Sequence, residues 1–100
     1  MVKIVLLCNA GMSTSLLVNK MREHASNVGF ECEINAYASL AAADHVAGAH
    51  VVLIGPQIRH QLKDLKSRLA PIPVEAIDTV AYGMMDGKRV IDQVKKLIAS

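Results

Sequence analysis

The sequence predicts one α/β domain in which an open, four-stranded parallel sheet carries helices on both faces. Strand-like and helix-like segments alternate along the 100 residues, and this alternation is typical of such sheets. Two strand-like segments, the first and the third, are the most apolar, whereas another alternates between apolar and polar residues. The apolar segments are therefore expected in the centre and the alternating one at an edge. With right-handed crossovers, the strand order 2-1-3-4 satisfies both conditions.

Four segments are expected to be strands, and their patterns differ in an informative way. The first and third are buried on both faces, while the second points Cys32, Ile34 and Ala36 to one side and polar residues and Tyr37 to a wet side. The expected strands are 2–8, 31–37, 51–54 and 74–77.

Helices are expected between the strands, where apolar residues recur at helical spacing. The first shows the stripe Leu17, Met21, Ala25 and Val28, with Gly29 as a stop signal. Ser39 is expected to cap a short Ala-rich helix that ends at Gly48. Residues 55–57 read as a loop and 78–86 are not assigned. The expected long helices are 13–27, 58–69 and 87–99.

Composition excludes several classes of function. Aromatic residues make up only 3% of a chain that is 52% hydrophobic, so the core is expected to be aliphatic. A net charge of +2, scattered along the chain, does not favour nucleic acid. The strand-like start predicts that there is no signal peptide, and no apolar run approaches the roughly 20 residues of a membrane span. We therefore expect a cytoplasmic protein without direct membrane insertion, and a monomer.

The two cysteines, Cys8 and Cys32, show no metal-ligand or CxxC spacing, so reduced thiols are expected. No carboxylate cluster adjoins the loop after Cys8, which predicts a site without metal or other cofactor. The four histidines are dispersed and none is near Cys8 in sequence. A catalytic pair of histidine and cysteine is therefore not expected.

Cys8 is the candidate reactive residue, because it ends a central strand just before a short polar loop and a helix start. At the switch point of a 2-1-3-4 sheet, ligands bind beyond the carboxyl ends of the strands. Gly11 lets the loop turn its N–H groups inward, and the helix N-terminus adds about half a positive charge. The alternative is a buried core cysteine. The expected anion-binding loop is Asn9, Ala10, Gly11, Met12, Ser13, Thr14 and Ser15.

Three further residues are candidates around this site. Gln57 follows the third strand and either reaches the anion or is only a polar turn residue. Asp78 follows the fourth strand and either assists the chemistry in a minor way or caps the next helical turn. Tyr82, with Met12, is a candidate for an apolar rim.

These motifs resemble enzyme IIB of the bacterial sugar phosphotransferase system, in the lactose/cellobiose/chitobiose class and its cellobiose-like branch. The resemblance spans essentially the whole chain, residues 1–100, as one such domain. The quoted segments are Cys8-Asn9-Ala10-Gly11-Met12-Ser13-Thr14-Ser15, Val52-Leu53-Ile54-Gly55-Pro56-Gln57-Ile58, Val74-Glu75-Ala76-Ile77-Asp78, and Tyr82-Gly83 with Asp86-Gly87.

The resemblance implies a phosphocysteine carrier. A phosphorylated IIA protein would donate a phosphoryl group from phosphohistidine to Cys8, and the phosphocysteine would pass it to a sugar held by the membrane IIC permease. The implied sugar is a disaccharide such as cellobiose or chitobiose. The resemblance also implies that residues 9–15 cradle the phosphate.

A low-molecular-weight tyrosine phosphatase of flavodoxin-like fold is an alternative, because it uses a similar loop. Its signature places an arginine six residues after the cysteine, where this chain has Thr14, and residues 9–15 contain no arginine. That arginine clamps the phosphate oxygens and accelerates transfer. Its absence favours a carrier over a hydrolase. A flavodoxin-like binding module without enzymatic activity is the third alternative.

Overall fold

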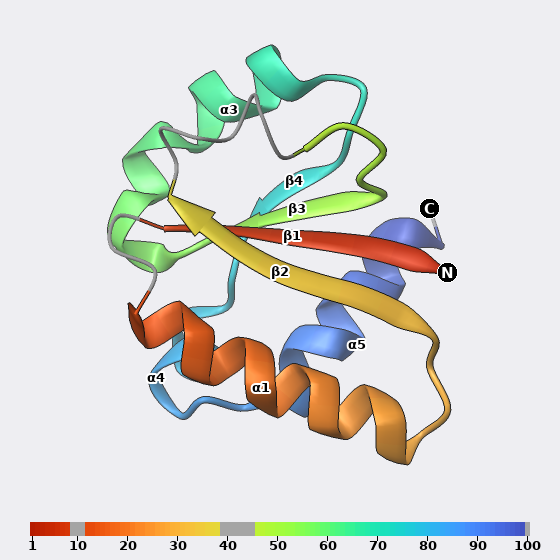
Figure 1. Ribbon diagram of the computed structural model, residues 1–100. Helices are drawn as coiled ribbons and strands as arrows, with labels where there is room; N and C mark the ends of the chain where they lie inside the picture. The colour runs from red at the N-terminus through yellow and green to blue at the C-terminus, as the bar shows by residue number, and fades with distance from the viewer. Residues whose placement is uncertain (9–11, 39–45, 100) are drawn as a thin grey trace.

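Four parallel strands form the sheet in the order β2-β1-β3-β4, as the sequence predicts (Figure 1). The structure, a computed structural model, describes the backbone of residues 1–8, 12–38 and 46–99 and their side chains except those of 12–14. The strands are β1 (Val2–Cys8), β2 (Cys32–Ala38), β3 (Val51–Ile54) and β4 (Val74–Ala76). Cys8 pairs in register with Ala38 of β2, and Leu7 pairs with Ile54 of β3.

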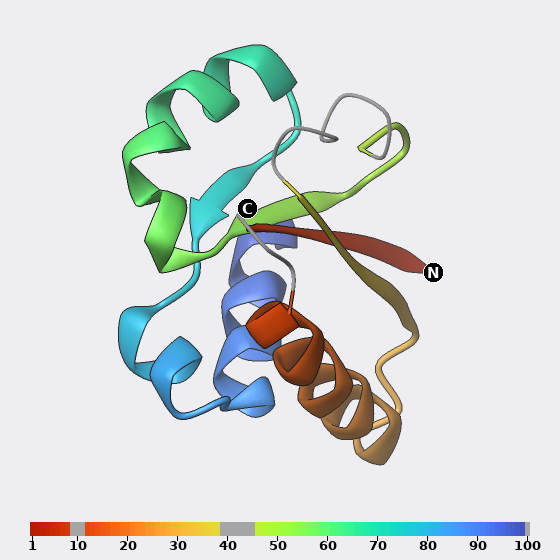
Figure 2. The same ribbon diagram turned by 60° about the vertical axis from the view of Figure 1, so that its left-hand side comes forward.

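Helices cover both faces of this sheet. Two long helices, α1 (Met12–Asn27) and α5 (Gly87–Ile98), pack together below the sheet in Figure 1. The 3-10 helix η2 (Pro56–Gln61) continues into α3 (Leu62–Leu69) on the opposite face, and the short α4 (Thr79–Gly83) follows β4. The carboxyl ends of the strands, the start of α1, η2 and α4 gather at one end of the molecule (Figures 1 and 2).

The core consists of two aliphatic clusters, one on each face of the sheet. Consecutive β1 residues alternate between them: Ile4 and Leu6 belong to the α1–α5 side, and Val5 and Leu7 to the α3 side. This is why consecutive residues of β1 from Ile4 to Leu7 are all apolar. Members from the helices include Leu17, Met21, Val90, Ile91 and Val94 on the first face and Ile58 and Leu65 on the second.

Gly87 allows α5 to start directly against α1. A Cβ added there would lie 2.5 Å from the backbone carbonyl of Lys20 and 2.6 Å from the amide nitrogen of Met21. No side chain fits at that distance, so the close approach of the two helices requires glycine.

The structure corrects several expectations. Residues 56–57 are not loop but the start of η2, because Pro56 occupies the first helical turn, where its missing N–H costs nothing. The unassigned segment 78–86 contains α4. Val28 lies beyond the end of α1 and is 52% exposed.

Two further expectations concern β2 and the segment after it. Tyr37 lies on the expected wet side of β2, but it is partly buried and packs against the α3-side cluster. The short helix expected from Ser39 lies largely outside the described residues, although Gly48 has the positive φ of 79° that a helix stop would need.

Candidate functional site

Cys8 is placed by the centre of the sheet. It is the last residue of β1, which is flanked by β2 and β3, and its side chain is only 2% exposed. The chain then returns as α1 from Met12, so the N-terminus of a 16-residue helix lies three residues beyond the strand. Such a terminus presents unpaired N–H groups and about half a positive charge. The thiol therefore lies beside a favourable position for an anion.

The predicted anion-binding loop is only partly described. Residues 9–11 lie outside the described residues, as do the side chains of Met12, Ser13 and Thr14. The backbone of residues 12–14 is helical, and Ser15 is an exposed residue of the first turn. The role of residues 9–15 as a phosphate cradle therefore stays a prediction.

Gly55 brings the end of β3 against Cys8; the sequence predicts both at the switch point of the sheet, but not their direct contact. Its amide donates a 2.8 Å hydrogen bond to the carbonyl of Leu7. A Cβ added to Gly55 would lie 3.5 Å from Cβ of Cys8 and 2.4 Å from Oε1 of Gln57. The only signal in the sequence is a Gly-Pro pair directly after an apolar strand at the switch point.

Gln57 lies over Gly55 and contacts Tyr82 of α4. Its Nε2 donates a 2.7 Å hydrogen bond to the Tyr82 hydroxyl. The Tyr82 ring is half-buried and packs against the α1–α5 cluster. Because its hydroxyl accepts this hydrogen bond, Tyr82 makes a polar contact in addition to the apolar rim expected for it. The structure thus brings Gln57 and Tyr82 to the same end of the sheet as Cys8.

Asp78 caps α4, which was one of its two predicted roles. Its carboxylate accepts a 3.0 Å hydrogen bond from the amide of Ala81, and it lies 3.9 Å from the guanidinium of Arg89. It follows β4, which is separated from β1 by β3. At the usual strand spacing this is about 10 Å across the sheet, which places Asp78 beside the site and not at Cys8.

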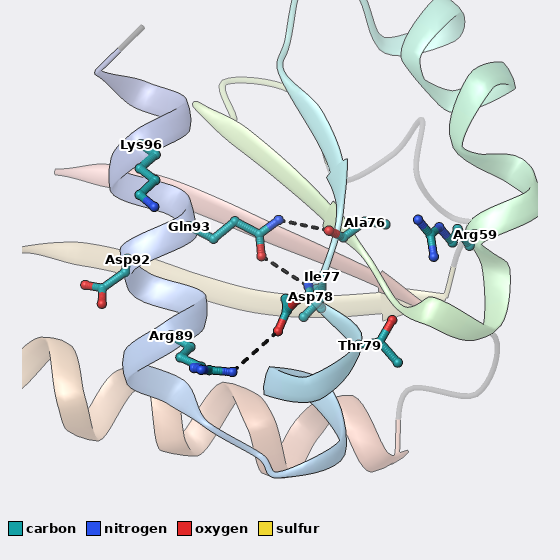
Figure 3. Close-up of a pocket in the computed structure, with 9 residues that line it drawn as sticks. All are labelled: Arg59, Ala76, Ile77, Asp78, Thr79, Arg89, Asp92, Gln93 and Lys96. Atoms are coloured by element: carbon teal, nitrogen blue, oxygen red, sulfur yellow. Dashed lines mark hydrogen bonds and ion pairs between the residues drawn. The ribbon is translucent and has the colours of Figure 1, made fainter.

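A hollow of ≈ 780 Å³ adjoins Asp78, between η2, the end of β4 and α5 (Figure 3). The basic side chains Arg59, Arg89 and Lys96 line it together with Asp78 and Asp92. These charges are mixed in sign and two strands away from Cys8, so the hollow is a neighbour of the cysteine site and not the site itself.

Gln93 fixes the wall of this hollow, and sequence reasoning gave no sign of it. Its Nε2 donates to the carbonyl of Ala76 at 2.8 Å, and its Oε1 accepts from the amide of Asp78 at 3.2 Å (Figure 3). The carboxamide thereby occupies the outer edge of β4 as a peptide group of a fifth strand would.

Cys32 and two of the histidines are far from Cys8. Cys32 pairs with Val2 at the other end of β1, and burial raises the pKa of its thiol. His24 is in the last turn of α1, and Nδ1 of His50 accepts a 2.9 Å hydrogen bond from the amide of Lys3. These three residues therefore lie outside the candidate site, as expected, while His45 is outside the described residues.

No helix among the described residues is both long and apolar enough to cross a membrane. The same residues contain no group of three or more histidine, cysteine or acidic side chains that would hold a metal ion.

Comparison with known proteins identifies the family to which this chain belongs. Residues 3–93 match the family model "PTS system, Lactose/Cellobiose specific IIB subunit", where PTS is the phosphotransferase system. The chain is 44% identical to the oligo-beta-mannoside-specific EIIB component of Bacillus subtilis, with 100% of this chain and 99% of that protein covered. It is 36% identical to the galactose-specific EIIB component of Lactococcus lactis subsp. cremoris, with 95% and 94% covered.

Among solved structures, the chain is similar to the cellobiose-specific phosphotransferase IIB component of Borrelia burgdorferi. The TM-score is 0.81 at 35% identity, with 98% of this chain and 92% of that chain covered. These matches confirm the resemblance drawn from the motifs. A IIB component of this system works with IIA and IIC proteins as its partners in general. The chain belongs to the lactose/cellobiose-specific IIB family and is a phosphotransferase component of the sugar phosphotransferase system.

Proposed function

We propose that Cys8 is the phosphoryl acceptor and donor of this IIB protein. It accepts the group from a phosphohistidine of a IIA protein and passes it to a sugar held by the membrane IIC permease. The observation that carries this proposal is the position of Cys8 at the carboxyl end of the central strand β1, four residues before Met12, the first residue of α1.

The transfer at Cys8 is a pair of displacements at phosphorus. In the first, the thiolate forms an S–P bond as the P–N bond of phosphohistidine breaks. The imidazole nitrogen keeps the electron pair and takes up a proton, which balances the proton lost by the thiol. In the second, a sugar hydroxyl attacks phosphorus and loses its proton, and the S–P bond breaks to return the thiolate.

Residues 9–15 are proposed to hold the phosphoryl group between these steps. Their backbone N–H groups and the hydroxyls of Ser13, Thr14 and Ser15 are the donors that this segment offers. No arginine is among them, so the site binds phosphate without the bidentate clamp that speeds attack by water. Such a site favours a phosphocysteine that survives until it meets the next partner.

Two accessory roles complete the proposal. Gln57 is proposed to contact the phosphoryl group, because its side chain lies over Gly55 beside Cys8. Asp78 is proposed to contribute little to the chemistry, because its carboxylate caps α4.

The sugar is proposed to be a β-linked disaccharide or oligosaccharide, with cellobiose and chitobiose as candidates. Relatives of this chain are described as specific for oligo-beta-mannoside, cellobiose and galactose, so family membership alone does not select among them. The bound sugar is held by IIC in this scheme. We further propose that residues 1–100 act as one monomeric, cytoplasmic domain that needs no cofactor.

Mass spectrometry tests the proposal directly. Incubation with phosphoenolpyruvate, the general phosphotransferase proteins and a cognate IIA should add about 80 Da, the mass of one phosphoryl group. Cys8→Ser should remove that gain, and Cys32→Ser, the matched control, should keep it. Absence of the gain in the wild-type protein would contradict the proposal.

The two alternative functions give different results. A phosphatase-like hydrolase would release phosphate from p-nitrophenyl phosphate, whereas a carrier should release a negligible amount. A binding module would neither release phosphate nor gain mass. Adding membranes that contain the cognate IIC and either cellobiose, chitobiose or mannobiose identifies the sugar by which of them discharges the phosphocysteine.

A further inference from the structure

A hydrogen bond joins two elements that follow different strands, at the end of the sheet where Cys8 lies. Gln57 is in η2, which follows β3, and Tyr82 is in α4, which follows β4. Nε2 of Gln57 donates to the Tyr82 hydroxyl at 2.7 Å, well within the range of a good hydrogen bond. We call this pair the Gln57–Tyr82 bridge.

The bridge fixes where the Gln57 carboxamide lies relative to Cys8. Its Oε1 lies over Gly55, 2.4 Å from the point that a Cβ would occupy, and that point is 3.5 Å from Cβ of Cys8. The carboxamide therefore occupies the space directly above the residue that contacts the cysteine.

The chemistry of the carboxamide gives this placement a use. An amide nitrogen carries two hydrogens, and Tyr82 accepts one of them. The second hydrogen has no partner among the described residues, and Gln57 lies at the end of the sheet where the phosphoryl group is proposed to bind. The bridge holds Nε2 on the Tyr82 side and leaves Oε1 against Gly55, so the second N–H is the group of this carboxamide that can donate to an anion.

α4 is itself held firmly, so that Tyr82 is a fixed anchor. Asp78 caps the helix through the amide of Ala81, and Gln93 holds the amide of Asp78. The Tyr82 ring packs against the α1–α5 cluster. These contacts join the bridge to the core of the molecule.

We propose that Tyr82 is a positioning residue for phosphoryl transfer at Cys8 and that it acts by orienting the Gln57 carboxamide toward the phosphoryl group. This proposal rests on the proposed function of Cys8. It adds a residue of α4 that contacts the reacting group only through Gln57.

Two variants test the proposal by different routes. Tyr82→Phe removes the hydroxyl and keeps the packed ring. Gly55→Ala leaves both residues of the bridge in place but puts a methyl group where Gln57 Oε1 lies, which displaces the carboxamide. The backbone of Gly55, with φ −64° and ψ 149°, is one that alanine adopts readily, and the atom that must move is the end of a flexible side chain, so this variant should still fold.

The measurement is the single-turnover rate of Cys8 phosphorylation against the concentration of phosphorylated IIA. Both variants should lower the limiting rate about tenfold or more, since a hydrogen bond to a charged group is lost. The half-saturating IIA concentration should stay the same. The ³¹P chemical shift of the phosphocysteine should change as well, which a purely structural role would not cause. Met84→Leu, at a 70% exposed neighbour of Tyr82, is the matched control and should match the wild type in each readout.

The outcomes distinguish failure of the positioning role of Tyr82 from failure of the proposed function of Cys8. If the wild type gains no phosphoryl group, both fail. If it does, and both variants keep its limiting rate and ³¹P shift, only the positioning role of Tyr82 fails. A raised half-saturating concentration with an unchanged limiting rate would overturn it too, because it would make the bridge a docking contact. Should Tyr82→Phe unfold, Gly55→Ala alone decides.

Discussion

Gln93 and Asp78 are joined at the edge of the sheet, where the side-chain oxygen of Gln93 accepts the amide hydrogen of Asp78 at 3.2 Å (Figure 3). The same carboxamide donates to Ala76 at 2.8 Å. One side chain of α5 thus satisfies two backbone groups at the end of β4, which is an edge strand of the sheet that the described residues form. It also anchors the segment from which α4 begins.

Gln93→Leu should destabilise the protein, because it removes the partner of the part-buried Ala76 carbonyl and of the exposed Asp78 amide. We expect the free energy of unfolding to fall by about 1–3 kcal/mol. Chemical denaturation measures it. Asp92→Asn, on the exposed neighbour, is the control and should stay within about 0.5 kcal/mol of the wild type. An unchanged stability of Gln93→Leu would mean that water replaces the carboxamide at no cost.

Asp78→Ala and Asp78→Asn should differ, because Asp78 acts as a helix cap. Asparagine caps helices as well as aspartate, whereas alanine loses about 0.5–2 kcal/mol. The ion pair with Arg89 is exposed and long at 3.9 Å, so its loss adds little. Thermal unfolding with the phosphotransfer assay checks this. Loss of phosphotransfer in a folded Asp78→Asn would instead give the carboxylate a direct part in the chemistry.

The sheet could be predicted from the sequence because a strand buried on both faces is apolar along its length, whereas a strand with one exposed face alternates between apolar and polar residues. Val5 and Leu6 face opposite clusters, so β1 is apolar from Ile4 to Leu7, while exposed Glu33 marks β2 as an edge strand. The position of Cys8 at the switch point followed from the strand order alone.

The contacts around the site could not be predicted in the same way. The bridge between Gln57 and Tyr82 spans 25 residues, and the clamp from Gln93 to Ala76 spans 17. Each depends on how the helices are placed over the sheet. The sequence around a single polar residue in a helix does not indicate which distant residue it will contact. The five-residue α4 is too short for a helical apolar period to show.

Gly87→Ala should destabilise the protein strongly for a helical glycine. Alanine usually favours a helix, but here its Cβ would lie 2.5 Å from the Lys20 backbone and force α1 and α5 apart. We expect a loss of about 1–3 kcal/mol in denaturant unfolding. Gly83→Ala in α4 is the matched control, since nothing lies within 4 Å of its added Cβ, and it should be neutral or slightly stabilising. Equal effects of the two substitutions would contradict the close approach of α1 and α5.

Cys32 should make the fold less stable at alkaline pH. Burial raises the pKa of its thiol in the folded state above the unfolded value of 9.0. The neutral thiol is therefore favoured by folding, and its contribution is fully present below pH 9.0 and is lost as the pH rises through the folded pKa. Unfolding of the Cys8→Ser variant, which leaves Cys32 as the remaining thiol, should show this loss as the pH rises above 9.0. Cys8→Ser/Cys32→Ala should show less of it, and identical pH profiles of the two proteins would rule out a desolvated Cys32. In the Cys8→Ser variant, alkylation of Cys32 by iodoacetamide at pH 8 should be slower than alkylation of free cysteine, because less of the buried thiol is ionised.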